Sequence, residues 1–464
     1  MQYVSTRGQA PALDFAGVLL AGLAEDGGLY IPESWPAVPP AEMAAFAGRP
    51  YADVATDIMA RYTEPSIPAA DLGSIVAEAY QGFDHVAVAP LRQLTADEWV
   101  LELFHGPTLS FKDYALQVVG RLFDHVLRRA GLRMTVVGAT SGDTGSAAIE
   151  AVRDRDAITA FILHPKGRVT DVQRRQMTTV TAANIHNIAI EGTFDDCQAL
   201  VKKMFGDPKF RGPLRLTAVN SINWARVMAQ VVYYFTTAAA LGSPECPPLF
   251  SVPTGNFGDA FAGHVARRMG LRIPQLIIAT NRNDILVRLL RTGEYKKGTV
   301  HATISPSIDI QVSSNFERLL FELTDGDAVK IVARMNALEE DGVFAVGANA
   351  LAKMRSEFSG RAVTEEETLT CMRDVWEQSG EVIDPHTAVG IVAGRAKRGA
   401  AAGPIVHLST AHPAKFQDAV REATGTTLAL PARLSDLLVL PERCDTLPND
   451  LSAVQEYIAE RAKT

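Results

Sequence analysis

Lys112 is the residue of this chain whose position best suits covalent chemistry. An apolar segment, Trp99–Phe104, is interrupted by Gly106-Pro107 and then gives way to an amphipathic pattern that begins near Lys112. This order predicts a strand followed by a helix with Lys112 in its first turn and Phe111 beside it. The positive end of a helix disfavours a protonated ammonium, so the amine could act as a nucleophile towards an aldehyde. A solvated surface lysine is the alternative, and it is the commoner situation for a lysine considered alone.

A glycine-containing loop, Gly255-Asn256-Phe257-Gly258, has the surroundings of a phosphate-binding site. It follows the apolar run Leu249–Val252 and precedes the helical pattern Ala260–Met269. A strand-to-helix loop turns backbone amides towards an anion, and glycine lets the backbone approach phosphate oxygens with no Cβ in the way. The side chain of Asn256 could close the loop. An ordinary turn remains the alternative, because a Gly-x-x-Gly pattern alone is not specific.

A second loop of this kind is Gly138-Ala139-Thr140-Ser141-Gly142-Asp143-Thr144-Gly145, ahead of a predicted helix over Ser146–Val152. Its hydroxyl groups and free amides also suit an anion. No Gly-Lys-Ser/Thr follows either loop, and the spacing of Gly138, Gly142 and Gly145 departs from Gly-x-Gly-x-x-Gly. Neither loop is therefore a Walker A motif, and a dinucleotide site has little support.

The segment Asn220–Arg226 is a third candidate for anion binding. It follows the predicted strand Leu214–Val219 and starts a helix, so its free amides could converge on one dianion together with the side chains of Ser221, Asn223 and Arg226. The alternative is a helix capped by Ser221 or Asn223, with Arg226 paired to a surface acid. The sequence does not decide between the two.

Four motifs that occur in this order give the chain a family resemblance. They are FHGPTLSFKD at 104–113, GATSGDTG at 138–145, PTGNFGD at 253–259 and LSTAHPAKF at 408–416. With further likeness at 22–32, 305–321 and 384–390, the chain resembles threonine synthase, in the longer-chain branch of that family. The resemblance implies the architecture of the fold-type II enzymes that use pyridoxal 5'-phosphate.

The resemblance also implies roles for the motif residues. Lys112 would form the Schiff base, Gly255, Asn256, Phe257 and Gly258 would hold the cofactor phosphate, Phe111 would lie beside the cofactor, and Thr410 would meet its pyridine nitrogen. Thr140, Ser141, Gly142, Asp143 and Thr144 would contact the substrate α-carboxylate, and Asn220, Ser221, Asn223 and Arg226 the substrate phosphate. On the residues alone, Thr410 fits a helix cap as well.

Asp143 departs from the pattern of many relatives, which have asparagine at this position. A carboxylate there would repel both the substrate carboxylate and the cofactor phenolate unless it were protonated or turned away. Its role stays open from sequence.

The implied activity is the conversion of O-phospho-L-homoserine and water to L-threonine and phosphate, the last step of threonine biosynthesis, by γ-elimination and β-addition of water. Two alternatives remain. One is a lyase like the serine and threonine dehydratases, whose substrates carry no phosphate. The other is a protein of this kind that binds pyridoxal phosphate without turnover. A site for a second phosphate would distinguish the first function from the dehydratases.

Composition limits the other possibilities. A formal net charge of -8 argues against a nucleic-acid partner, and four scattered cysteines fit a reducing cytoplasm rather than a disulfide framework. The N-terminal residues lack the apolar core of a signal peptide, and the longest apolar segment, Val227–Leu241, is too short to span a bilayer. We expect no membrane segment and no metal, since no pair of histidines has the spacing of a metal-binding helix. The oligomeric state is not predicted.

Strand-like runs alternate with helical ones from Trp99 onward, which predicts an α/β protein with two doubly wound, largely parallel sheets. The segment from Arg282 to about Glu381 has mainly helical patterns, with Thr364 as a helix start, and is predicted to be an insertion. The expected domains are a mainly helical one at 1–92, a first α/β domain at 93–217, a second at 218–440 and a helical tail at 441–464.

Overall fold

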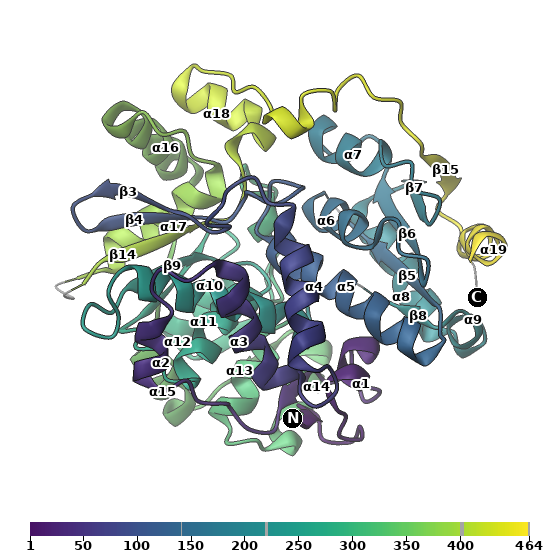
Figure 1. Cartoon of the computed structure of the whole chain (residues 1–464), viewed down its shortest axis with the longest axis horizontal. Coiled ribbons are helices and arrows are strands. Elements are labelled where there is room, and N and C mark those ends of the chain that lie inside the picture. Colours follow the sequence, from purple (N-terminus) through teal and green to yellow (C-terminus); the bar gives the residue numbers. More distant parts are fainter. Residues whose placement is uncertain (141, 219–220, 400–402, 463–464) are drawn as a thin grey trace. The chain divides into compact units, whose positions relative to one another are not determined.

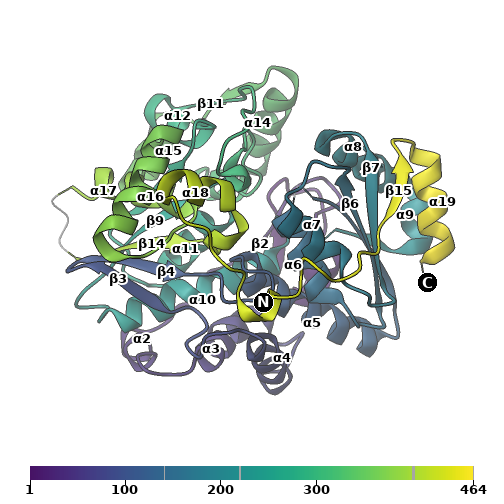
Figure 2. The same cartoon turned by 90° about the horizontal axis from the view of Figure 1, so that it is seen from above.

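The computed structural model describes residues 1–464 except 141, 219–220, 400–402 and 463–464. The chain forms two compact units (Figures 1 and 2). The first comprises residues 1–18, 23–111 and 221–428, and the second comprises residues 19–22, 112–220 and 429–464. Both units are therefore built from segments that are discontinuous in sequence, and the domain limits expected from sequence remain predictions.

The second unit is organised around a five-stranded parallel sheet with the order β15-β7-β6-β5-β8. Its strands are β5 (Met134–Ala139), β6 (Ile158–Pro165), β7 (Ile185–Glu191), β8 (Leu216–Thr217) and β15 (Asp445–Pro448). Its helices are α5 (Lys112–Ala130), α6 (Asp143–Val152), α7 (Asp171–Thr178), α8 (Phe194–Gly206), α9 (Pro208–Leu214) and α19 (Leu451–Arg461). Every residue of β6 is buried, as expected for an inner parallel strand covered on both faces.

Helices cover both faces of this sheet, with α19 on one side and α5 and α6 on the other (Figure 2). Phe161 and Ile188 of the strands share an apolar cluster with Leu200 of α8 and Ile458 of α19. Helices α5 and α6 pack closely because Gly120 lacks a side chain: a Cβ there would lie 2.2 Å from the carbonyl oxygen of Ala151. This packing fixes the two helices that begin at Lys112 and at Asp143.

The first unit contains a six-stranded sheet with the order β13-β10-β9-β14-β4-β3, parallel except for the β3–β4 pair. The strands are β3 (Leu91–Thr95), β4 (Glu98–Glu102), β9 (Leu249–Pro253), β10 (Leu276–Thr280), β13 (Phe358–Ala362) and β14 (Ile405–Ser409). Two antiparallel pairs stand apart from it, β1 (Tyr3–Ser5) with β2 (Tyr30–Pro32) and β11 (Glu294–Lys296) with β12 (Val343–Ala345). The expectation of largely parallel sheets is confirmed for both units.

The helices that lie wholly within the first unit come from its segments 23–111 and 221–428. They are α2 (Pro40–Ala45), α3 (Tyr51–Thr63), α4 (Ala69–Gln81), α10 (Trp224–Ala240), α11 (Gly258–Arg268), α12 (Ile285–Thr292), α13 (Phe316–Leu323), α14 (Ala328–Glu340), α15 (Ala348–Glu357), α16 (Glu365–Ser379), α17 (Pro385–Lys397) and α18 (Gln417–Thr424), while α1 (Phe15–Ala21) spans the boundary. Helix α17 packs on β9, β10 and β14, and α10 packs on α3 and α11.

The sequence indicated where several helices begin, but it did not indicate the edge strand β13. Helix α5 begins at Lys112, α11 begins at Gly258, and Thr364 caps α16 in a capping box with Glu367. Strand β13 was not foreseen in the mainly helical segment 282–381. It is a short edge strand with no apolar alternation, and its glycine at 360 lies close to Ile278 of β10.

Val227–Leu241 corresponds to α10, which is buried along nearly its whole length, as the sequence indicated. Within the part of the chain that the structure describes, none of the helices combines the length and the apolar character that crossing a membrane requires.

Asp259 is a buried carboxyl group in the first turn of α11. The hydroxyl groups of Tyr233 and Tyr234 on α10 both donate hydrogen bonds to its Oδ1. Burial raises the pKa of Asp259 to about 7, although the two hydroxyl groups oppose the change. In the folded protein this carboxyl group therefore holds a proton at a pH where the unfolded chain has lost it.

Asp259 should make the protein less stable as the pH rises. Its folded pKa is raised, so its contribution to the free energy of unfolding is full only below the unfolded pKa of about 4, falls as the pH rises and is lost once the pH passes 7. In Asp259→Asn the amide oxygen can still accept both tyrosine bonds. Urea unfolding should show that the variant gains, relative to the original protein, roughly 2 to 3 kcal/mol between pH 5 and pH 8. An equal difference at both pH values would show that Asp259 is ionised in the fold.

Candidate active site

The candidate residues are divided between the two units. Lys112 and the loop 138–145 belong to the second unit, whereas the loop 255–258, Thr410 and the described part of the segment 220–226 belong to the first. Asn220 and Ser141 lie outside the described residues.

The residues that precede Lys112 are paired with the segment that follows β14. Ser110 and Ala411 form an antiparallel bridge, and the Phe111 amide donates to the Thr410 carbonyl at 2.9 Å. Leu109 has φ +60°, which is strained for a residue other than glycine. The backbone leading into Lys112 is thus held in a conformation that it would not adopt alone.

Lys415 adds a side-chain contact to this pairing. Its buried Nζ donates to the Thr108 carbonyl at 2.9 Å. No role was expected for Lys415 from the sequence, although it lies in one of the four motifs. Burying a lysine is costly unless its ammonium has partners, and this one bonds to the loop that ends at Lys112.

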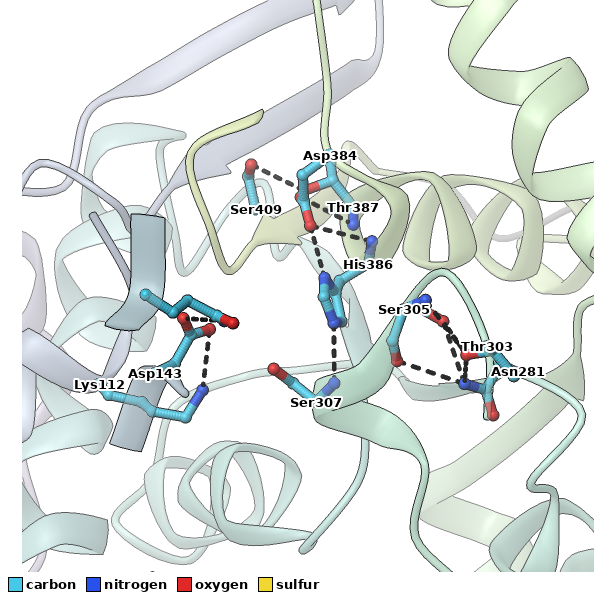
Figure 3. A network of polar contacts seen from close by, with 11 residues as sticks. Lys112, Asp143, Asn281, Thr303, Ser305, Ser307, Asp384, His386, Thr387 and Ser409 are labelled. Carbon is cyan, nitrogen blue, oxygen red and sulfur yellow. Dashed lines mark hydrogen bonds and ion pairs between the residues drawn. The ribbon is translucent and has the colours of Figure 1, made fainter. Parts of the chain in front are cut away.

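Lys112 faces Asp143 within the second unit (Figure 3). Its Nζ lies 3.6 Å from Oδ2 of Asp143, and both side chains are largely buried. Oδ1 of Asp143 accepts a hydrogen bond of 2.8 Å from the amide of Gln173, whose own oxygen accepts one from Thr170. The carboxylate that was hard to explain from sequence is therefore an ion-pair partner of the lysine, oriented by Gln173. Sequence analysis missed Gln173, because its 30-residue separation from Asp143 has no local signal.

The loop around Gly142 is held by its own threonine. Oγ1 of Thr140 accepts hydrogen bonds from the amides of Gly142 at 3.0 Å and Gly145 at 2.9 Å. Gly142 has φ +152°, and a Cβ there would lie 2.5 Å from the side chain of Gln173. The amides of Gly142 and Gly145, which were expected from sequence to be free for an anion, are thus bonded within the loop. Substrate contact by Thr140, Gly142, Asp143 and Thr144 remains a prediction.

The glycine loop of the first unit is shaped by the segment 305–315. A Cβ on Gly255 would lie 2.7 Å from the Ser307 carbonyl oxygen, so this position accepts only glycine without a shift. Ser313 donates to the Gly255 carbonyl, and Ser314 donates to the side-chain oxygen of Asn256 at 3.3 Å. The loop amides are thereby presented at the start of α11, which is the arrangement that an anion needs.

Phe257 anchors the same loop through its ring. It has φ +63° and is buried, with its ring 5.8 Å from that of Phe316 and 5.7 Å from that of Phe358. Only its backbone remains a candidate for contact with a cofactor phosphate.

His386 supports the segment that packs against Gly255 (Figure 3). Its Nε2 accepts a hydrogen bond of 3.1 Å from the Ser307 amide, so the proton lies on Nδ1, which is 2.6 Å from Asp384. Both ring nitrogens of His386 are thus occupied by hydrogen bonds within the protein.

Thr410 follows the last residue of β14 and is buried. The helix cap that was its alternative role belongs instead to His412, whose Nδ1 accepts from the Ala414 amide at 3.1 Å. A contact between Thr410 and a pyridine nitrogen stays a prediction.

The segment that ends at Arg226 shows one expected and one unexpected feature. Asn223 caps α10 by accepting from the Ala225 amide at 3.0 Å, which was the alternative to phosphate contact. Arg226 is 4% exposed, and within the described part of the chain its Nε and Nη1 have no hydrogen-bond partner. Burial lowers the pKa of Arg226 to about 10. The pairing with a surface acid does not occur among the described residues.

Comparisons with known proteins place this chain in a family. Family models described as the threonine synthase N terminus, a pyridoxal-phosphate dependent enzyme and the threonine synthase C-terminal region match residues 2–80, 83–336 and 387–458. The chain is 54% identical to threonine synthase of Pseudomonas aeruginosa over 99% of this chain and 98% of the relative. The chain belongs to the threonine synthase family. The family resemblance in the sequence is confirmed.

Solved structures of threonine synthases support the same assignment. The chain matches a pyridoxal-phosphate-bound threonine synthase from Brucella melitensis with a TM-score of 0.98 and 52% identity, covering all of both chains. The yeast enzyme matches with a TM-score of 0.94 and 40% identity over 99% of this chain and 98% of that one. The expected fold-type II architecture is thus confirmed.

The glycine loop of this threonine synthase family member gives a test of cofactor binding. Gly255→Ala should lower the affinity for pyridoxal phosphate at least tenfold, because its Cβ would force the loop or Ser307 to move. The free energy of unfolding of the cofactor-free protein should fall by much less than the free energy of cofactor binding, since only this contact must shift. Absorbance titration and urea unfolding measure the two quantities, with Gly206→Ala as the control because nothing lies within 4 Å of a Cβ there. Parallel losses in both would indicate a purely structural turn.

Proposed function

We propose that this chain converts O-phospho-L-homoserine and water to L-threonine and phosphate with pyridoxal 5'-phosphate. The observation that carries the proposal is the buried guanidinium of Arg226, whose Nε and Nη1 have no hydrogen-bond partner among the residues that the structure describes. Burying such a charge costs free energy unless it is paired, so an anionic group of a ligand is the fitting partner. The substrate phosphate is that group.

The residues present suit the cofactor. Gly255 lets the loop that starts α11 pack directly against the Ser307 carbonyl, and Lys112 provides an amine at the start of α5. When bound, pyridoxal phosphate supplies an electron sink for the substrate amino acid. We assign the cofactor phosphate to Gly255, Asn256, Phe257 and Gly258, with Phe111 beside the ring and Thr410 at its nitrogen.

Lys112 would move the protons in this reaction. Asp143 lies 3.6 Å from its Nζ and stabilises a proton on that atom, while Gln173 keeps the carboxylate turned towards the amine. This arrangement supports the transfer of the Cα and Cβ protons through Nζ. We assign the substrate carboxylate to Thr140, Ser141, Gly142, Asp143 and Thr144, and the substrate phosphate to Asn220, Ser221, Asn223 and Arg226.

The alternatives differ in what Arg226 would do. A dehydratase acting on serine or threonine has no phosphate to offer a buried arginine. A protein that only binds the cofactor has no use for a lysine paired with an oriented carboxylate. Both features therefore favour a catalyst that acts on a phosphorylated substrate.

Composition supports two further proposals, one about the class of molecule that the protein binds and one about its cellular compartment. The charge of -8 fits a small-molecule substrate rather than a nucleic acid, and the four cysteines are free thiols, which fits the cytoplasm.

Lys112 should be the residue that carries the cofactor. Borohydride treatment of the purified protein should fix the cofactor to the peptide that contains Lys112, and Lys112→Ala should fold while losing the visible absorbance. Lys166→Ala is the matched control, because Lys166 also pairs with a carboxylate, at 3.1 Å from Glu191, but is exposed. Label on another lysine would exclude the assignment.

Arg226 should affect substrate use without supporting the fold. Arg226→Met keeps the volume and removes a buried charge, so its thermal stability should equal or exceed that of the original protein. Loss of charge-assisted bonds worth about 1.5 to 3 kcal/mol should lower kcat/KM for O-phosphohomoserine at least tenfold. Arg226→Lys should recover only part of the loss, because an ammonium lacks the guanidinium fork.

Steady-state kinetics of both variants provide the measurement, with the exposed Arg421→Ala as the control. An unchanged kcat/KM in Arg226→Met would remove Arg226 from the substrate site.

A further inference from the structure

Arg318 is a second fully buried arginine in the first unit. It is 0% exposed and donates to three neutral oxygens: Nε to the Tyr30 carbonyl at 2.9 Å, Nη2 to the Ile222 carbonyl, and Nη1 to Oδ1 of Asn315. No carboxylate among the described residues forms an ion pair with it. Burial lowers the pKa of Arg318 to about 9. Its contacts join β2, the segment before α10 and the start of α13.

Asn315 connects two of the candidate phosphate sites. Its Nδ2 donates to the Ser221 carbonyl at 3.1 Å and to the Asn256 carbonyl at 3.2 Å, and its backbone amide donates to the Asn256 carbonyl at 3.0 Å. Asn256 belongs to the cofactor loop, and Ser221 belongs to the segment that ends at Arg226. One side-chain amide therefore contacts both.

Arg318 fixes the orientation of that amide. A guanidinium can only donate, so the atom of Asn315 that it contacts must be the oxygen. The nitrogen is then directed to the two carbonyls. If the amide were reversed, its oxygen would face two acceptors and its nitrogen would face a donor. The direction of the bridge thus depends on the buried arginine.

The buried charges of two arginines also indicate that anions bind in this region. Arg226 and Arg318 are both buried in one unit, and neither forms an ion pair with a carboxylate among the described residues, although Glu317 attracts Arg318 electrostatically. Arg318 lies 5.8 Å from the ring of Trp224 at the start of α10. Uncompensated buried cations are costly, and they become favourable when an anion arrives nearby. A cofactor phosphate and a substrate phosphate are both such anions.

We propose that Arg318 is a positioning residue that acts through Asn315 to hold the cofactor-phosphate loop and the substrate-phosphate segment in one fixed arrangement. The substrate part of this inference rests on the function proposed above. Neither residue need touch a ligand, because Asn315 contacts only the carbonyl sides of the two segments. Loosening the bridge should weaken both phosphate sites together.

Asn315→Asp is the sharpest test. The aspartate still accepts from Arg318 but has no side-chain N–H, so the Ser221 and Asn256 carbonyls lose their shared donor. The dissociation constant of pyridoxal phosphate for the cofactor-depleted full chain should rise at least fivefold. The inhibition constant of inorganic phosphate against O-phosphohomoserine, measured at saturating cofactor, should rise by a similar factor.

Arg318 can be tested in two steps that separate charge from geometry. Arg318→Lys keeps the charge but cannot reach all three oxygens, and Arg318→Met loses both. Both constants should rise in each variant, and more in Arg318→Met. If Arg318→Met does not fold, Asn315→Asp and Arg318→Lys still decide the matter.

Three control variants separate this role from general destabilisation. Arg355→Met removes an arginine that likewise donates to two backbone carbonyls, those of Leu290 and Arg291, and should leave both constants unchanged. Ser314→Ala removes a contact to Asn256 alone and should change only the cofactor constant. Arg226→Met should change only the phosphate constant.

The outcomes are distinguishable. A joint rise in Asn315→Asp, with single effects in Ser314→Ala and Arg226→Met, supports the bridge. A rise in only one constant, or in neither, for folded Asn315→Asp would overturn it. If Arg226→Met leaves the phosphate constant unchanged, the proposed substrate site fails, whereas failure of Asn315→Asp beside an effective Arg226→Met refutes the bridge alone.

Discussion

Backbone amides that are to receive a phosphate must have no partners inside the protein, so other groups have to hold the loops that carry them. This constraint explains much of the polar structure around both glycine loops. Ser313 and Asn315 bond to carbonyl oxygens of the loop 255–258, which leaves its amides directed the other way. The loop 138–145 is held differently. Oγ1 of Thr140 accepts hydrogen bonds from two amides of this loop, and these bonds fix the rest of the loop. The side chains that hold an anion-binding loop in place therefore include residues that are distant from it in sequence.

Buried positive charge is the second feature that bears on anion binding in this structure. Arg226 and Arg318 are desolvated within the first unit, and each has a pKa lowered by burial. A fold selected only for stability would replace such groups with apolar side chains, which are often neutral or stabilising. Their retention is consistent with binding energy that becomes available only when an anion is present. Stability and affinity are therefore in opposition at these positions.

The sequence predicted the parts of the site that have a local pattern. Lys112 in the first turn of a helix, and the glycine loop between β9 and α11, follow from hydrophobic periodicity and from the positions of glycine. Contacts between distant segments had no such signal. The orientation of Asp143 by Gln173 and the bridge made by Asn315 depend on strand order and helix packing. The edge strand β13 was missed because its residues carry no alternating pattern.

The discontinuous second unit has a consequence for folding during synthesis. Its sheet takes β15 as an edge strand beside β7, and its apolar cluster includes Val454 and Ile458 of α19. These residues leave the ribosome long after Lys112 and both glycine loops have been made. Until these residues are made, the nascent chain therefore carries Lys112 on a unit that still lacks part of its core. The core of the second unit is complete only when β15 and α19 have joined it.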